Sequence, residues 1–410
     1  MDSQDKILGI GTYEKKIYLL LKACLSEGES LEIHPQFDFY APQGIKKINL
    51  KAQTAIEVKF RLIYDTLSKI MYQYDNKSNE VACLVVVFYE TVSSFSLQFL
   101  HDKQELHGRD ILILSYEDLY KKGGRPNIKE NANEKANIGK DIEDKILSQA
   151  KESIRRDKVS LFLGAGVSAS AGIVTWDKLI EQLCITKRLS KLDSDIADTI
   201  KGRYIVSQYR EPNKELTYEF YEDIKSILYS SSPKTSSLLE TIAQIVDKSN
   251  IESIITYNYD DLLERAISSK KCHAVYDKSR PNDGDEIQIY HVHGYIPHEG
   301  KSSEVILGEK EYHKIYQEAY NWGNVEQLHA LCRSTCFFVG LSMNDPNLRR
   351  LLDIAGDGGN EREAVHFAFL REIEHNVPFT EDIMRSFGIS CIWYKQHKDL
   401  PKLLKCLISE

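Results

Sequence analysis

Short strand-like segments separated by segments of helical periodicity recur along the second half of the chain. They occupy residues 159–163, 251–256, 286–291, 335–339, 365–370 and 389–394. The first of them is a short apolar run of the kind that is typical of a buried strand. Because these strand-like segments alternate with helical segments, they predict an α/β fold with a parallel, doubly wound sheet, whose ligand lies at the carboxyl ends of the strands.

The helical pattern is clearest on either side of the first of these runs. Apolar positions recur at helical spacing over residues 142–154, which predicts a helix that leads into the strand at 159–163. Residues 216–245 predict a helical insert rich in tyrosine, interrupted at Ser231-Ser232-Pro233.

The first third of the chain shows a smaller set of elements. A helix is expected over residues 12–25 and another over 61–74, with strands at 31–39, 53–60, 81–89 and 111–115. The polar stretch 121–140, which opens with Lys-Lys-Gly-Gly-Arg-Pro, is typical of a linker. The pattern therefore predicts a smaller α/β domain over 1–120, a linker over 121–140 and a larger domain over 141–410.

The composition is that of a soluble two-domain protein. The chain has 410 residues, of which 42% are hydrophobic and 28% charged. No apolar run approaches the length of a membrane span, and the first residues lack a signal-peptide pattern, so we expect a cytoplasmic protein with no membrane contact. The net charge of −8 gives no general attraction to nucleic acid.

The eight cysteines contain no Cys-x-x-Cys pair. Cys332 and Cys336 are separated by a helical spacing rather than by the spacing of a zinc knuckle. We therefore expect reduced, mostly buried thiols and no zinc.

A glycine-rich turn follows the strand at 159–163. Gly164, Gly166 and Gly172 lie where the backbone must pass close to another group, and amides that open toward a following helix can bind phosphate. The spacing differs from Gly-x-Gly-x-x-Gly, so these residues alone leave open a tight strand–helix turn without a ligand.

Three motifs, in order, resemble signatures of the sirtuin family. They are Gly-Ala-Gly-Val-Ser at 164–168 followed by Ala-Gly-Ile at 171–173, Thr-Tyr-Asn-Tyr-Asp at 256–260, and His-Gly at 293–294. The resemblance extends from about residue 141 to the C-terminus. It implies a sirtuin-like, Rossmann-type parallel sheet with a helical insert, and NAD as the substrate.

The resemblance also implies roles for individual residues. Asn258 and Asp260 match residues near the ribose and the attacking water, and His293 matches the catalytic base. The residues implied in NAD binding are Gly164, Ala165, Gly166, Ser168, Gly172, Trp176, Asn258, Gly340, Ser342 and Asn344.

Several alternatives stay open within these motifs. His291 lies two residues before His293 and is its rival if the strand register differs. Asp345 lies in the late loop that resembles the cover of the adenosine ribose, but an Asn-Asp-Pro turn equally caps a helix. Trp176 and Trp322 are typical packing residues as well as candidate ligands.

The sequence also departs from the family pattern. Tyr257 replaces the usual Gln, Thr175 and Asp177 stand where Asp and Arg are common, and the four-cysteine zinc module is missing. These differences put the nicotinamide pocket and any transfer to acyl-lysine in doubt. Water is then the simplest acceptor of the ribosyl group.

Two segments of the first domain resemble the Pro-Asp…Asp/Glu-x-Lys pattern of the restriction-endonuclease-like superfamily. Asp38 and Glu57 would hold Mg²⁺, Lys59 would position water, and Glu14 is a candidate third carboxylate. A solvated strand face with alternating charge produces the same pattern, and some members of this superfamily only bind DNA or partner proteins.

Together these features resemble bacterial anti-phage effectors that destroy NAD. The expected function is hydrolysis of NAD⁺ to ADP-ribose and nicotinamide, with Mg²⁺-dependent DNA cleavage as a second activity. A homo-oligomer, a HerA-type hexameric ATPase and DNA are the partners that the resemblance implies. The alternatives are a nuclease whose sirtuin-like domain senses NAD or ADP-ribose, and a protein deacylase.

Overall fold

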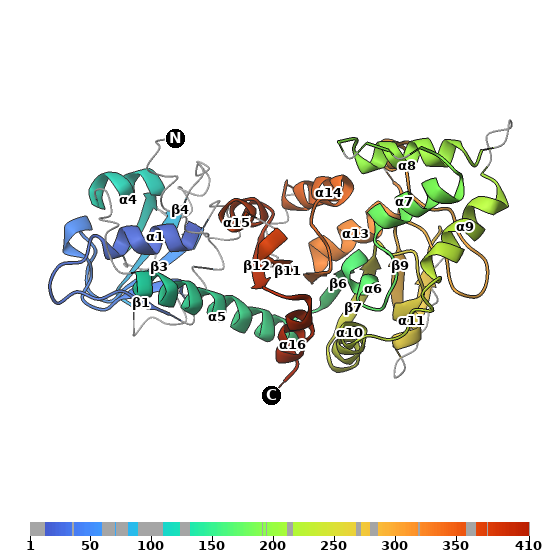
Figure 1. Ribbon diagram of the computed structural model, residues 1–410. Helices are drawn as coiled ribbons and strands as arrows, with labels where there is room; N and C mark the ends of the chain where they lie inside the picture. Colours follow the sequence, from blue (N-terminus) through green and yellow to red (C-terminus); the bar gives the residue numbers. More distant parts are fainter. Residues whose placement is uncertain are drawn as a thin grey trace. The chain divides into compact units, whose positions relative to one another are not determined.

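A computed structural model describes most of the chain (Figure 1). The described residues are 13–34, 37–59, 70, 81–88, 110–123, 132–190, 192–193, 195–210, 216–267, 272–278, 286–318, 320–357, 366–374 and 376–409. They divide into two compact units. The first unit comprises residues 1–148, 358–363 and 375–390, and the second comprises 149–357, 364–374 and 391–410.

The first unit contains a five-stranded sheet with the order β1-β2-β3-β4-β5. The strands are β1 (Glu32–Ile33), β2 (Phe39–Ala41), β3 (Thr54–Lys59), β4 (Cys83–Phe88) and β5 (Asp110–Ser115), accompanied by helices α1 (Tyr13–Lys22), η2 (Lys46–Ile48) and α4 (Tyr116–Gly123). The pairs β1/β2 and β2/β3 are antiparallel, whereas β3/β4 and β4/β5 are parallel. Phe37, Leu84 and Val86 lie in the core on one side of this sheet.

The structure corrects two predictions for this part of the chain. The single strand expected over 31–39 is two short antiparallel strands in which Ile33 pairs with Phe39. The sequence places Pro35 between them, and a proline has no amide to donate to a ladder. The helix expected over 61–74 lies outside the described residues, apart from residue 70.

The second correction concerns the expected linker. Helix α5 (Ala132–Arg156) is continuous over 25 residues, so residues 132–140 are helical rather than irregular. Alanine, glutamate and lysine are good helix formers, and this segment contains all three. The polar composition of residues 132–140 therefore belongs to a helix, and the domain boundaries drawn from it stay a prediction.

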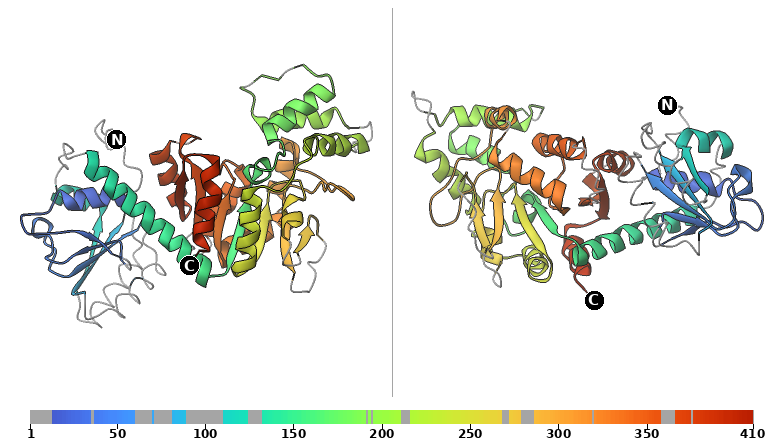
Figure 2. Two further views of the ribbon diagram at one scale, coloured as in Figure 1. Left: turned by 60° about the horizontal axis from the view of Figure 1, so that its bottom comes forward. Right: turned by 180° about the vertical axis from the view of Figure 1, so that it is seen from behind.

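The second unit is built on a seven-stranded sheet with the order β12-β11-β10-β6-β7-β9-β8 (Figures 1 and 2). The strands are β6 (Val159–Leu163), β7 (Ile251–Thr256), β8 (Cys272–Val275), β9 (Ile287–His291), β10 (Thr335–Val339), β11 (His366–Arg371) and β12 (Ile389–Tyr394). Adjacent strands from β11 through β8 run parallel. The α/β fold with a parallel sheet and a smaller N-terminal sheet domain is thus confirmed.

The strand order reverses between β6 and β10, and this reversal locates the candidate site. From β6 the chain proceeds to β7 on one side, and it returns to β10 on the other side. In doubly wound sheets ligands bind where the order reverses, outside the carboxyl ends of the strands. Gly164 follows β6 and Gly340 follows β10, so both glycines lie at this point.

Helices cover the sheet of the second unit and form a group of their own (Figure 2). They are α6 (Ala165–Ala169), α7 (Trp176–Thr186), α8 (Asp198–Ser207), α9 (Tyr218–Leu228), α10 (Ser237–Lys248), α11 (Leu262–Ala266), α12 (Glu309–Gln317), α13 (Trp322–Arg333), α14 (Pro346–Asp357) and α16 (Leu400–Leu407). The second unit also contains the short helices η3 (Glu372–Glu374) and η4 (His397–Asp399), whereas α15 (Val377–Ser386) belongs to the first unit. Helix α13 packs on β10, β7 and β9, while α7, α8, α9 and α12 pack among themselves. The predicted interruption at 231–233 falls between α9 and α10, as expected.

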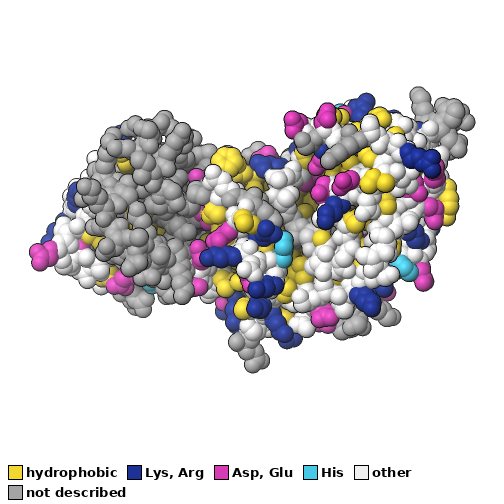
Figure 3. All heavy atoms as spheres, viewed as in Figure 1, with side chains coloured by type: hydrophobic (Ala, Val, Ile, Leu, Met, Phe, Trp, Pro, Cys, Tyr) yellow, Lys and Arg dark blue, Asp and Glu magenta, His cyan; other side chains and the backbone are white. Residues whose placement is uncertain are grey.

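Charge is mixed on the face of the second unit that Figure 3 shows. On the face shown in Figure 3, acidic and basic side chains are interspersed, and Lys and Arg side chains gather around α16. Among the described residues, no helix has the length and apolar character needed to cross a membrane.

His366 gives the second unit a predictable response to acid. Its side chain is 4% exposed, and its Nδ1 accepts a hydrogen bond from the Cys336 amide at 3.1 Å. Burial lowers the pKa of His366 to about 4, below the value of about 6.5 for an unfolded chain. The stability contributed by the neutral ring is present above pH 6.5 and is lost as pH falls through 4.

We expect His366→Gln to remove this part of the pH dependence. In the parent, about 3 kcal/mol of the free energy of unfolding should be lost between pH 6.5 and pH 4, and the variant should lose correspondingly less. Urea denaturation across this pH range measures the difference. The exposed His313 supplies the control, since His313→Gln should keep the parental slope.

Candidate active site

The glycine turn after β6 packs directly against the loop after β10. The Gly166 amide donates to the Gly340 carbonyl at 3.0 Å, and the Gly164 amide donates to the Val339 carbonyl at 3.0 Å. A Cβ atom at Gly164 would lie 2.5 Å from the Gly340 carbonyl oxygen, and Gly340 itself has φ of +68°. Glycine is needed here because two backbones meet. The turn still presents Ala165 and Gly166 to solvent.

Asn258 connects the end of β7 to this turn. Its Nδ2 donates to the Gly164 carbonyl at 3.0 Å and to Ser168 Oγ at 2.8 Å. Asp260, 4% exposed, accepts from the Leu262 amide at 3.2 Å and from the Ser168 hydroxyl. Burial raises the pKa of Asp260, although these hydrogen bonds oppose the rise. The structure therefore brings Asn258, Asp260 and Ser168 together with the glycine turn.

His293 follows β9 and is enclosed by aromatic rings. Its side chain is buried, and its ring lies 4.8 Å from that of Tyr257 and 5.5 Å from that of Tyr312, edge to face in both cases. Nε2 is buried without a hydrogen-bond partner and lies 3.7 Å from Asp345 Oδ2. Burial lowers the pKa of His293. The ring is therefore neutral near pH 7, as a general base requires.

His291, the rival of His293, is occupied on both ring nitrogens. Nδ1 donates to the Asn258 carbonyl at 2.9 Å, and Nε2 lies 2.6 Å from Glu264 Oε1. Burial works against a charged ring, but Glu264 and the Asn258 carbonyl outweigh it and raise the pKa of His291. A ring held in this way orients the backbone of Asn258 and has no free nitrogen for a substrate.

The remaining candidates lie around this cluster. Trp176, at the start of α7, donates to the hydroxyl of the buried Tyr259. Gly172, with φ of +101°, contacts Ser231 Oγ, which donates to its carbonyl at 2.7 Å. Ser342 and Asn344 are exposed on the loop after β10.

Asp345 caps helix α14, which is one of the two roles expected for it, the other being contact with the adenosine ribose. Its Oδ1 accepts from the Leu348 amide at 2.8 Å in the first turn of α14. Its Oδ2 accepts from the Tyr312 hydroxyl at 2.8 Å. The cap is thus confirmed, and the second oxygen faces the histidine.

Some residues of the site carried no motif. Tyr312 lies on α12, Gln327 on α13 accepts from the Tyr257 hydroxyl, and Glu264 holds His291. Glu264 lies four residues after the motif at 256–260, which implies no role for it. Only the folded positions of α12 and α13 bring the other two to the site.

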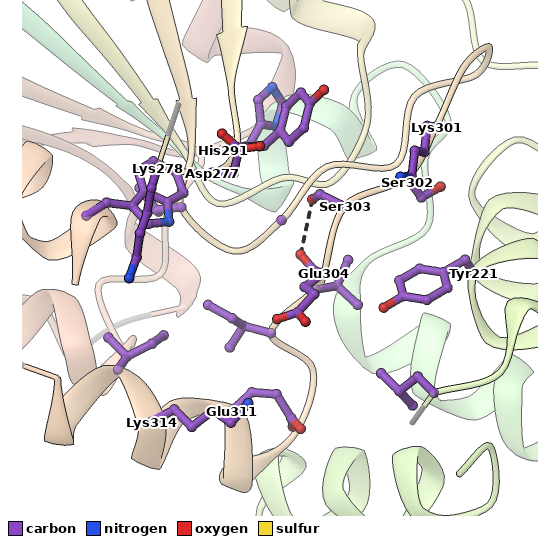
Figure 4. Close-up of a pocket in the computed structure, with 18 of the residues that line it drawn as sticks. Tyr221, Asp277, Lys278, His291, Lys301, Ser302, Ser303, Glu304, Glu311 and Lys314 are labelled. Atoms are coloured by element: carbon purple, nitrogen blue, oxygen red, sulfur yellow. Dashed lines mark hydrogen bonds between the residues drawn. The ribbon is translucent and has the colours of Figure 1, made fainter. Parts of the chain in front are cut away.

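A cavity of about 1170 Å³ lies beside the end of β9. His291, Val292 and Gly294 line it, whereas Asn258 and His293 are not among its lining residues. Figure 4 shows side chains of both charges around it, with Lys278 and Lys314 on one side and Lys301 opposite. The cavity thus adjoins the site without containing its proposed base.

The candidate metal ligands of the first unit lie on neighbouring strands. β2 and β3 are antiparallel with Phe39 opposite Ile56, which places Asp38 opposite Glu57 just beyond the end of β2. Asp38 Oδ2 accepts from the Val58 amide at 2.7 Å, and Oδ1 lies 2.8 Å from Lys145 Nζ. The backbone places Glu14 on α1 and Lys59 on β3, but their side chains lie outside the described residues.

The described residues give no support for a Mg²⁺ site here. Each oxygen of Asp38 accepts a hydrogen bond, and one of the donors is an ammonium group. Within the described part of the chain, no group of three or more His, Cys, Asp or Glu residues could hold a metal ion. The Mg²⁺ site therefore stays a prediction.

We expect Lys145→Ala to destabilise the first unit. The Lys145 and Asp38 side chains are 16% and 11% exposed, so removal of the ammonium takes a nearby cation away from a largely buried carboxylate. The free energy of unfolding should fall by about 2 kcal/mol, less than for a fully dehydrated pair. Denaturant unfolding measures this loss.

Lys121→Ala is the matched control for this prediction. Lys121 pairs with Glu117 at 3.5 Å, but the two side chains are 70% and 80% exposed. Its replacement should change stability by less than about 0.5 kcal/mol. Equal effects of the two substitutions would show that Asp38 does not depend on Lys145.

Comparison with known proteins bears on the second unit. A family described as "SIR2-like domain" matches residues 252–392, which contain Asn258, Asp260, His293 and Asp345. These residues are thus similar to SIR2-like domains. The matched segment begins after the glycine turn at 164–168, so the family comparison does not include the turn.

Curated relatives extend the similarity over more of the chain. "NAD(+) hydrolase ThsA" of Enterococcus faecium is 26% identical over 246 residues, 58% of this chain and 48% of the relative. The protein of that name from Acinetobacter baumannii is 24% identical over 229 residues, 54% of this chain and 44% of the relative. "NAD-dependent protein deacylase" of Pseudomonas putida is 31% identical over 128 residues, 31% of this chain and 44% of the relative. The chain thus spans about half the length of the curated relatives that it matches.

A solved structure described under "Structural Basis for the Mechanism and Regulation of Sir2 Enzymes" also matches. It is 17% identical, covers 65% of this chain and 98% of its own, and has a TM-score of 0.35.

Proposed function

We propose that the second unit hydrolyses NAD⁺ to ADP-ribose and nicotinamide. The observation that supports this most directly is the buried His293, whose pKa is lowered, at the same sheet edge as Asn258 and the glycine turn. Curated relatives named NAD(+) hydrolases support the same reaction at 23–26% identity.

Each group of site residues has a separate role in this reaction. The glycine turn lies where the strand order reverses, which is where ligands of doubly wound sheets bind, and its exposed residues Ala165 and Gly166 leave room for the diphosphate. Asn258 and Asp260 provide polar groups for the ribose, which becomes oxocarbenium-like as nicotinamide leaves. His293 accepts the proton of the attacking water.

The ribose can reach His293 only if the rings of Tyr257 or Tyr312 move. His293 is 8% exposed and lies between Tyr257 and Tyr312, whereas Ala165 and Gly166 are exposed. The diphosphate site is thus accessible before the base is. We infer that NAD is cleaved only when Tyr312 or Tyr257 moves away from His293.

Product analysis tests the reaction. The purified 410-residue chain should release nicotinamide and free ADP-ribose from NAD at equal rates, with or without an acetylated peptide, because water is the proposed acceptor. Chromatography separates these products from O-acetyl-ADP-ribose. Acetyl transfer at a rate comparable to hydrolysis would favour the deacylase alternative instead.

The biological setting belongs to the same proposal. We propose an anti-phage effector that acts in the cytoplasm as a homo-oligomer, with a HerA-type ATPase as partner. The resemblance of the motifs to such effectors supports this setting. DNA cleavage is not part of the proposal, because nothing among the described residues of the first unit supports a Mg²⁺ site.

A further inference from the structure

We propose that Asp345 is a positioning residue that supplies the negative charge for His293, and that Tyr312 controls how strongly it does so. This inference rests on the proposed hydrolysis of NAD. It assigns to Asp345 a role in the chemistry beyond capping α14. Three observations carry it.

The first observation is the unpaired nitrogen of His293. Its Nε2 is buried without a hydrogen-bond partner, and a buried polar atom left in this state is costly. The nearest carboxylate oxygen is Asp345 Oδ2 at 3.7 Å, too long for a hydrogen bond but within reach of a small movement. A carboxylate only accepts, so this pairing requires the proton on Nε2. Nδ1 is then the basic nitrogen.

The second observation is the way Asp345 is held. Oδ1 accepts from the Leu348 amide, and Oδ2 accepts from the Tyr312 hydroxyl. The carboxylate is therefore fixed by a helix cap on one oxygen and is partly neutralised by a donor on the other. Loss of the Tyr312 hydroxyl would leave more negative charge facing the histidine.

The third observation is the set of groups around the ring. The titratable groups that face His293 among the described residues are Tyr257 after β7, Tyr312 on α12 and Asp345 before α14. Burial raises the pKa of both tyrosines, so they stay neutral. Tyr259 and Tyr316 interact electrostatically with Tyr312, and the charge of Glu311 contributes to the raised pKa of Tyr259. Asp345 is the anion that counteracts the effect of burial on His293.

The charge matters because the reaction creates a cation. The water oxygen forms a bond to C1′ of the ribose, and the bond from C1′ to the nicotinamide nitrogen breaks with its electron pair on nicotinamide. The water proton moves to Nδ1, which makes His293 an imidazolium. A fixed anion beside Nε2 stabilises that state without reorganisation, and the proton then passes to solvent.

A titration of His293 tests the coupling without any need for activity. The full-length chain is labelled at histidine ¹³Cε1, and His293→Gln identifies the His293 signal. Asp345→Asn should lower the pKa of His293 by about one unit. Tyr312→Phe should raise it. Asparagine caps a helix as well as aspartate does, so α14 is expected to stay intact.

Kinetics then test the catalytic consequence. Asp345→Asn should lower kcat by about 10²-fold and shift the acid limb of kcat/KM to lower pH. Tyr312→Phe should shift that limb to higher pH. A merely structural cap would change stability and leave both the pKa of His293 and the acid limb at parental values, which would overturn the proposal.

The two proposals fail in different ways. If the parent releases no nicotinamide from NAD, hydrolysis is wrong, whereas the titration still decides whether Asp345 acts on His293. If Asp345→Asn does not fold, Tyr312→Phe decides alone, because it leaves the cap untouched. An unchanged pKa of His293 in that variant overturns the coupling.

Discussion

His293→Ala is expected to lower the rate of NAD hydrolysis by about three orders of magnitude, because general-base catalysis typically contributes 10²- to 10⁴-fold. Asn258→Ala should also abolish hydrolysis. Its Nδ2 joins the end of β7 to Gly164 and Ser168, so its loss removes a polar group of the site and loosens the turn. Fluorescence of an etheno-NAD analogue measures both effects.

The control for this pair is His313→Ala. His313 is an exposed histidine of α12 in the same unit, and its replacement should leave hydrolysis at the parental rate. Circular dichroism should show the same helix content in all three variants. If His293→Ala and Asn258→Ala both cleave the analogue at the parental rate, the active site lies elsewhere.

Gly164→Ala is expected to destabilise the second unit by about 4 kcal/mol and to lower NAD hydrolysis by at least 10²-fold. The new Cβ atom would lie 2.5 Å from the Gly340 carbonyl oxygen and from the Leu341 side chain. Overpacking usually costs about 1–3 kcal/mol, and the cost is higher here because backbone cannot swing aside as a side chain does. Denaturant unfolding and nicotinamide release measure the two losses.

Gly356→Ala provides the matched control. Gly356 lies in α14, and a Cβ atom there would meet nothing within 4 Å. Alanine is the better helix former, so stability should stay the same or rise by up to about 1 kcal/mol. A tolerated Gly164→Ala would mean that the strand ends can separate, and the close contact of the two loops would then not be required.

Elements buried on both faces were predictable because burial produces a continuous apolar run. β6, β7, β9, β10 and β12 fall within the predicted segments, and β11 extends one residue beyond its segment. β8 was missed, since an edge strand that is mostly half-buried carries a mixed pattern. The hairpin of β1 and β2 was predicted as one strand because apolar alternation does not reveal a reversal of direction.

The sequence by itself determined the α/β class and placed Gly164, Asn258, Asp260 and His293 after buried strands. Motif residues that follow strands of one parallel sheet must meet at one edge, so their proximity follows from topology alone. The structure brings Asn258 to the glycine turn as this predicts.

Only the tertiary structure decided which partners these residues have. Asp345 lies 52 positions after His293 (345 − 293) and Tyr312 comes from another helix, yet they meet around one ring. Lys145 reaches Asp38 across 107 positions. The tertiary structure also decided that both ring nitrogens of His291 have partners, whereas His293 Nε2 has none. The pKa is raised for His291 and lowered for His293, because the pKa of an imidazole depends on its burial and on neighbouring charges. Those quantities arise from packing between distant segments, which local sequence patterns do not contain.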